Sequence, residues 1–235
     1  MLTTWEASFS AVEHRSAVAA RLLILLAFLS YDDISTDLFC GHTGSDERGT
    51  LDITNSTSTW QSTVSPEDAI DLYIIEACMR MLQEYSLIQW RQDQQSYTMH
   101  KLVHAWGSDR LSTEEQRQFS RAALQLLAGA VSVRQADLEY RTRLVLQVST
   151  NFAAVSKAYI AIDASDSCVL DLLWELSGFL QAMGRYWEAQ GVIVFLVKGY
   201  RATSGEEHPD TITAMSNLAL TLGDQGKLDE AATMK

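Results

Sequence analysis

Proline is scarce in this chain: only Pro66 and Pro209 occur in 235 residues, and both stand where a helix could begin. Proline breaks a helix interior because it lacks the backbone N–H and clashes with the preceding turn. So few breaks, together with 47% hydrophobic and 20% charged residues, exclude a disordered chain and favour a mostly α-helical globular fold.

Cysteine is also scarce and shows no functional spacing. Cys40, Cys78 and Cys168 are odd in number, far apart and without a CxxC pair. This pattern excludes a disulfide framework and a cysteine-based zinc site, so we expect reduced thiols in a cytoplasmic protein.

Basic residues are outnumbered, with 18 lysines and arginines against 30 acids and a net charge of −12. Nucleic acids and anionic lipid surfaces both attract basic proteins, so neither is expected as the main partner. The most apolar run, residues 18–29, contains Arg21 and is shorter than the ~20 residues that cross a bilayer. We therefore expect no membrane partner.

The sequence also lacks a phosphate-binding loop of the pattern GxxxxGK[ST], whose backbone N–H groups and lysine hold nucleotide phosphates. Glu13 and His14 are adjacent in the sequence. Adjacent side chains point in different directions on a helix, so these two residues do not form a catalytic pair. We expect a protein that is not an enzyme and binds no cofactor by itself.

What the sequence does contain is a repeat of 42 residues. Seven positions recur at this offset, namely Leu176/Leu218, Leu180/Leu222, Gly184/Gly226, Arg185/Lys227, Tyr186/Leu228, Glu188/Glu230 and Ala189/Ala231. A period of this length is typical of a solenoid of stacked helix pairs. We expect the leucines in the core and the glycines and alanines at close helix contacts. We also expect an incomplete array, because the second unit stops within its pattern at Lys235.

The N-terminal part has the element order of a winged-helix module. The pattern predicts helices over 5–29, 31–39, 66–85 and 101–111, and a hairpin of strands 87–90 and 97–100. Residues 41–65, rich in small polar residues, are expected to form a mobile surface loop. The helix over 66–85 carries five acids against Arg80 alone, which argues against binding DNA.

Three N-terminal stretches carry a family likeness: residues 4–9 (TWEASF), the helix over 22–29, and residues 98–103 (TMHKLV). Together they resemble the region after the nucleotide-binding core in fungal NLR-like STAND proteins, which combine an NB-ARC-type ATPase, a winged helix and tetratricopeptide repeats. Residues 205–211 (GEEHPDT) and 217–219 (NLA) resemble the kinesin-light-chain-like class of those repeats.

The patterns and the likeness together predict a mostly α-helical fold of three parts. They are a winged-helix-like module with a small β-hairpin over 1–111, including the loop 41–65, then a helical connector over 112–165, and tetratricopeptide repeats over 166–235. The repeats amount to about one and a half units of an α-solenoid.

The likeness also implies two binding residues. In that family the histidine of the Met-His motif contacts the phosphates of bound ADP, and His100 is the matching position, although Lys101 follows it where plant and animal relatives have aspartate. ADP or ATP would then bind only through a nucleotide-binding domain outside these residues. The alternative is a strand-end histidine with an ordinary backbone hydrogen bond. His100 and His104 are four residues apart, but no third ligand is evident, so no metal is expected.

The second implied residue is Asn217. In the kinesin-light-chain-like class an asparagine at this position lies in the concave groove and binds the backbone of a peptide. Glu175 occupies the equivalent position of the first unit and departs from the pattern.

The sequence therefore predicts a cytoplasmic, non-catalytic regulatory and protein-interaction segment of an NLR-like signalling ATPase of innate immunity. Its winged helix would be a nucleotide-state sensor and lid on a nucleotide-binding domain. Its repeats would be a ligand-sensing or autoinhibitory scaffold for protein or peptide partners. The alternative is a stand-alone tetratricopeptide adaptor that binds peptide segments of partner proteins.

Overall fold

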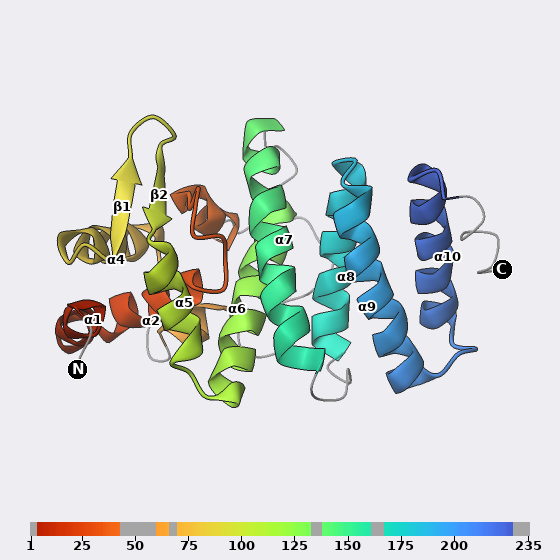
Figure 1. The fold of residues 1–235 in the computed structure, drawn as a ribbon, viewed down its shortest axis with the longest axis horizontal. Coiled ribbons are helices and arrows are strands. Elements are labelled where there is room, and N and C mark those ends of the chain that lie inside the picture. Colours follow the sequence, from red (N-terminus) through yellow and green to blue (C-terminus); the bar gives the residue numbers. More distant parts are fainter. Residues whose placement is uncertain (1–3, 43–59, 66–69, 133–137, 161–166, 228–235) are drawn as a thin grey trace. The chain divides into compact units, whose positions relative to one another are not determined.

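The computed structural model describes residues 4–42, 60–65, 70–132, 138–160 and 167–227. The chain divides into two compact units, residues 1–135 and residues 136–235 (Figure 1). The fold is mostly helical, with a small two-stranded antiparallel sheet in the first unit and a helical repeat in the second, as the sequence predicts. The division places α6 (Thr113–Val131) in the first unit and α7 (Leu138–Ile160) in the second, so the predicted connector is shared between them.

The first unit is built around helix α2 (Ala17–Leu26). This helix is apolar on nearly every side, which is typical of a helix surrounded by protein. It packs against α1 (Thr4–Arg15), α3 (Trp60–Val64), α4 (Leu72–Glu84), α5 (Lys101–Asp109) and α6. Its buried residues are Ala19, Ala20, Leu22, Leu23, Ile24, Leu25 and Leu26.

The single helix predicted over 5–29 is wrong, because the chain breaks between α1 and α2 at Ser16. Ser16 has extended backbone angles (φ −156°, ψ 105°), and its hydroxyl oxygen accepts a hydrogen bond from the Ala19 N–H at 3.1 Å. Serine satisfies a free N–H group at the start of a helix, so it favours this position over a helix interior.

The surface loop predicted over 41–65 is wrong at its C-terminal end; residues 43–59 lie outside the described part of the chain. Residues Trp60–Val64 form the short helix α3, which packs against α2 and α6. The Trp60 side chain is only 1% exposed, and its ring lies 5.4 Å from that of Phe39, in the 3-10 helix η1 (Thr36–His42). One large apolar side chain therefore anchors a stretch that is polar on average.

Helix α4 also begins later than predicted, at Leu72 instead of Pro66; residues 66–69 are not described. Asp71 is extended, and its carboxylate accepts a hydrogen bond from the Ile74 N–H at 2.8 Å. This N-cap satisfies a free donor of the first turn, which explains the start at Leu72.

The predicted hairpin is confirmed, with strands β1 (Ile88–Arg91) and β2 (Ser96–Met99) in antiparallel register. The pattern did not predict a third extended residue beside it. Ile34 forms a β-bridge with Tyr97, each backbone N–H donating to the other's carbonyl oxygen at 2.8 Å. After the hairpin come α5 and α6, and α6 opens with a capping box of Ser112 and Glu115.

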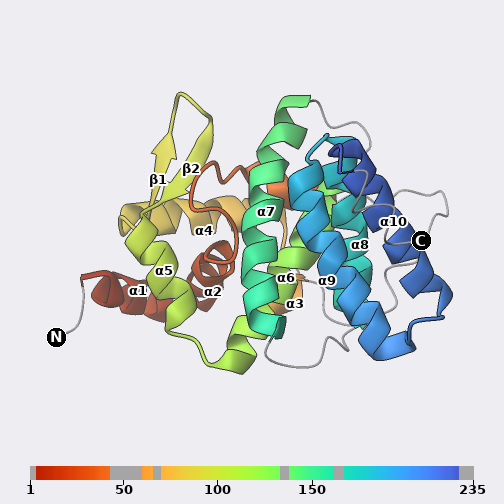
Figure 2. The same cartoon turned by 45° about the vertical axis from the view of Figure 1, so that its right-hand side comes forward.

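The second unit consists of α7, α8 (Ser167–Ala182), α9 (Tyr186–Ser204) and α10 (Pro209–Asp224). Helix α9 packs against both α8 and α10, which lie beside it (Figure 1, Figure 2). The predicted core leucines are confirmed, since Leu176, Leu180, Leu218 and Leu222 are all buried. None of the helices in the described ranges is both long and apolar enough to cross a membrane.

The packing role predicted for the repeat glycines is wrong. Gly184 and Gly226 have φ of +69° and +80°, and a Cβ added at either would meet no atom within 4 Å. Glycine is needed there because the backbone turns through the left-handed region after α8 and α10. Ala189 is buried as predicted, while Ala231 lies outside the described residues.

Candidate functional sites

His100 lies between strand β2 and helix α5, where it is the N-cap of α5. Its Nδ1 accepts a hydrogen bond from the Leu102 backbone N–H at 3.2 Å. The ring is exposed and stacks on Trp5 of α1, with 6.0 Å between the ring centroids. This geometry corresponds to the ordinary backbone contact given as the alternative for His100.

His104 does not share a site with His100. Its Nε2 lies 2.8 Å from the Leu29 carbonyl oxygen, at hydrogen-bond distance, and its ring contacts the edge of Tyr31. A histidine tied to a buried carbonyl in this way holds α5 against the end of α2. Within the described ranges there is no group of three or more His, Cys, Asp or Glu placed to hold a metal ion.

The second candidate site is a surface made by α8 and α10, which we call the A-helix face. It consists of three residues from each helix, related by the 42-residue offset: Asp171, Glu175 and Gly178 of α8, and Thr213, Asn217 and Leu220 of α10. Spacings of three, four and seven put each trio on one side of its helix. Those sides point away from the buried stripes, such as Leu176 and Leu218, that form the core.

Helices α8 and α10 contact each other through a side-chain hydrogen bond. Near their C-terminal ends, the side-chain amide of Gln181 donates to the hydroxyl oxygen of Thr221 at 2.8 Å. Near their N-terminal ends, Asp171 and Asp210 are close enough for the negative charge of Asp210 to raise the pKa of Asp171. The hydrogen bond joins the C-terminal ends and the electrostatic interaction acts between the N-terminal ends, so α8 and α10 run in the same direction, as the first helices of consecutive repeat units do.

Asn217 is half-buried on this face, and its side-chain amide has no hydrogen-bond partner among the residues the structure describes. The same face carries the exposed Leu220 on α10 and the exposed Glu175, which is the residue of α8 equivalent to Asn217. Sequence reasoning named Asn217 and Glu175 but missed Asp171 and Leu220. The offset of 42 residues that relates Asn217 to Glu175 also relates Thr213 to Asp171. The repeat could therefore have indicated Asp171 from the sequence.

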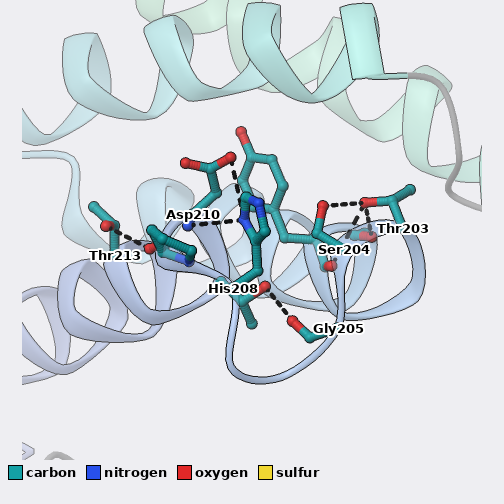
Figure 3. Close-up of polar contacts among 10 residues, drawn as sticks. Thr203, Ser204, Gly205, His208, Asp210 and Thr213 are labelled. Atoms are coloured by element: carbon teal, nitrogen blue, oxygen red, sulfur yellow. Dashed lines mark hydrogen bonds and ion pairs between the residues drawn. The ribbon is translucent and has the colours of Figure 1, made fainter.

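The loop between α9 and α10 is fixed by short polar contacts (Figure 3). His208 is the N-cap of α10, and its Nδ1 accepts a hydrogen bond from the Asp210 N–H at 3.3 Å. The carboxylate of Asp210 lies 3.5 Å from the same nitrogen. The hydroxyl of Thr211 donates to the Gly205 carbonyl oxygen at 2.7 Å and ties the helix start to the end of α9.

The electrostatics at this end of the face are negative. Partial burial, followed by the negative charges of Asp171 and Asp210, raises the pKa of Tyr200 on α9 to about 12. Partial burial and the charge of Asp210 likewise raise the pKa of Asp171. Both shifts disfavour an additional negative charge at the N-terminal ends of α8 and α10.

Comparison with known proteins assigns the repeat. Residues 168–234 match the family model of the tetratricopeptide repeat. The second unit therefore carries tetratricopeptide repeats, as predicted, and such repeats generally mediate contacts between proteins. Residues 10–116 match a domain of unknown function, DUF7779. No curated protein and no solved structure matches the chain.

Proposed function

We propose that this chain is the non-catalytic, regulatory and protein-interaction part of an NLR-like signalling ATPase. The A-helix face of the second unit binds an extended segment of a protein partner. The first unit is a lid that senses the nucleotide held by another domain of the same protein.

The observation that carries the proposal is the tetratricopeptide repeat together with its uncovered face. Leu220 is 65% exposed on the A-helix face, although the leucines of the other side of α10 are buried. Beside it, the amide of Asn217 offers two donors and an acceptor, which suit the backbone of an extended peptide. Exposed apolar surface rimmed by polar groups is typical of a binding site.

The lid role has a separate basis. Along the chain, the first unit has a helix, the extended residue Ile34, a short helix, a helix and a hairpin. Ile34 pairs with β2 and so takes the place of a third, short strand. A winged helix has this order. His100 follows the last strand directly and is exposed, so its Nε2 is available to a phosphate oxygen presented by a second domain.

The first test is whether the A-helix face binds peptides. We expect selection from a random peptide library displayed on phage to enrich binders of the full chain. Leu220→Asn should weaken their binding about tenfold, because central apolar anchors carry much of the free energy of peptide binding. Affinities are measured by fluorescence anisotropy of the synthesised peptides.

Leu102→Asn is the matched control, because Leu102 on α5 is also an exposed helical leucine, at 56%, and lies in the other unit. It should leave the affinity unchanged. Failure to enrich any peptide, or equal binding to the Leu220→Asn variant and the unchanged chain, would show that the A-helix face is not the binding surface.

The second test concerns the nucleotide. Adding excess ADP or ATP to this chain should leave hydrogen exchange unchanged over residues 98–106, because one histidine without a phosphate-binding loop binds phosphate weakly. Mass spectrometry of the exchanged peptides measures this directly. Clear protection of residues 98–106 would mean that the chain has its own nucleotide site and would overturn the assignment of His100 to a lid on another domain.

A further inference from the structure

We infer that the partner segment bound by the A-helix face is basic, with arginine or lysine side chains placed beside an apolar residue. This inference rests on the proposed function, because it names the chemistry of the partner for the same face.

The A-helix face is negatively charged. Helices α8 and α10 carry four carboxylates, those of Asp171, Glu175, Asp210 and Asp224, and no lysine, arginine or histidine. Asp171 and Glu175 lie on the A-helix face itself and are exposed. A partner with positive charges therefore meets complementary potential along the whole face, whereas an acidic segment or a nucleic acid meets repulsion.

One cation near this surface already has an acidic partner. Arg201 of α9 is paired with Glu206 in the following loop at 3.4 Å. Asp171 and Asp210, on different helices, meanwhile repel each other. A cationic side chain of a partner would relieve that repulsion, so binding gains more than one isolated surface ion pair.

The apolar part of the face completes the description. Leu220 is the exposed apolar residue of the face, and the half-buried Trp174 borders the face between Asp171 and Gly178 on α8. An indole ring beside two carboxylates suits an arginine, which stacks on aromatic faces while it pairs with acids. Gly178, the residue of α8 equivalent to Leu220, is exposed, and a Cβ added there would meet no atom within 4 Å, so an apolar side chain of a partner has room beside α8.

The experiment uses three synthetic peptides that share a leucine-containing glycine-serine background. One carries arginines, one carries glutamates at the same positions, and one carries glutamines. Binding to the full chain is measured by fluorescence anisotropy at about 0.15 M salt, where long-range attraction is largely screened. We expect the arginine peptide to bind best, and the double variant Asp171→Asn with Glu175→Gln to bind it about tenfold more weakly.

The matched control is Asp109→Asn with Glu76→Gln, which removes the same two charges from exposed positions of the first unit. It should change the affinity for the arginine peptide less than twofold. If both double variants lost the same affinity for the arginine peptide, the binding would be explained by general attraction to a chain of net charge −12. That result would contradict the inference.

The same peptides separate this inference from the proposed function. If the glutamine or glutamate peptide binds best and Leu220→Asn still abolishes binding, the face binds peptides but the partner is not basic. If no peptide binds and the library selection also fails, the proposed function fails with it.

Discussion

Replacing Trp60 with alanine should lower the free energy of unfolding by about 3–5 kcal/mol, the range for truncating a fully buried aromatic side chain. Trp60 is 1% exposed, contacts the ring of Phe39 and anchors α3 against α2 and α6. Because globular domains are stable by only about 5–15 kcal/mol, a loss of this size removes much of the stability of the first unit. Urea unfolding followed by far-ultraviolet circular dichroism measures it.

Trp90→Ala is the control for this prediction. Trp90 belongs to the same unit but is 40% exposed on strand β1, where its ring contacts that of Tyr97 across the hairpin. Its truncation should cost about 1 kcal/mol, the value of a cross-strand aromatic pair. If Trp60→Ala were no more destabilising than Trp90→Ala, α3 would not be part of the core in solution.

In the second unit, Leu176→Ala should destabilise by about 2–5 kcal/mol, because it removes a fully buried side chain and leaves a cavity. Leu176 has no exposed surface and belongs to the stripe of α8 that forms the repeat core together with Leu180. The loss should appear as faster amide exchange throughout α8, α9 and α10, since stacked repeats are stabilised by their neighbours.

Leu220→Ala makes the same chemical change on the exposed side of α10, where the side chain is 65% exposed. We expect a change of at most about 0.5 kcal/mol in stability, the usual range for surface substitutions. Binding of library-selected peptides should nevertheless weaken, which separates a functional residue from a structural one of the same type. A stability loss as large as that of Leu176→Ala would place Leu220 in the core and remove it from the A-helix face.

Local patterns predicted most of the helices and strands correctly, because the interactions that form them lie within a few residues. The hairpin follows from two short strands around a polar tip. The errors have two causes. At Ser16 a local cap hydrogen bond interrupts a helix that the apolar spacing alone predicted to be continuous. At Trp60 a tertiary contact buries a residue of a segment that is polar in composition.

The candidate sites were predicted only in part for a related reason. His100 and Asn217 were found through family likeness, whereas Asp171 and Leu220 gain their significance from each other across two helices. Single residues on separate helices carry no signal until the helices are paired. The hydrogen bond from Gln181 to Thr221 and the electrostatic interaction of Asp171 with Asp210 provide that pairing.

The sequence by itself determined the helical composition, the hairpin and the 42-residue repeat, because these depend on periodicity and spacing along the chain. Only the tertiary structure decided which distant residues meet. It paired Ile34 with Tyr97, buried Trp60 beside Phe39, and gave the repeat glycines a role in turning the backbone and not in packing. It also joined the exposed sides of α8 and α10 into one face. The physical reason is that burial and charge are properties of a position in space, which the chain acquires only when its elements pack.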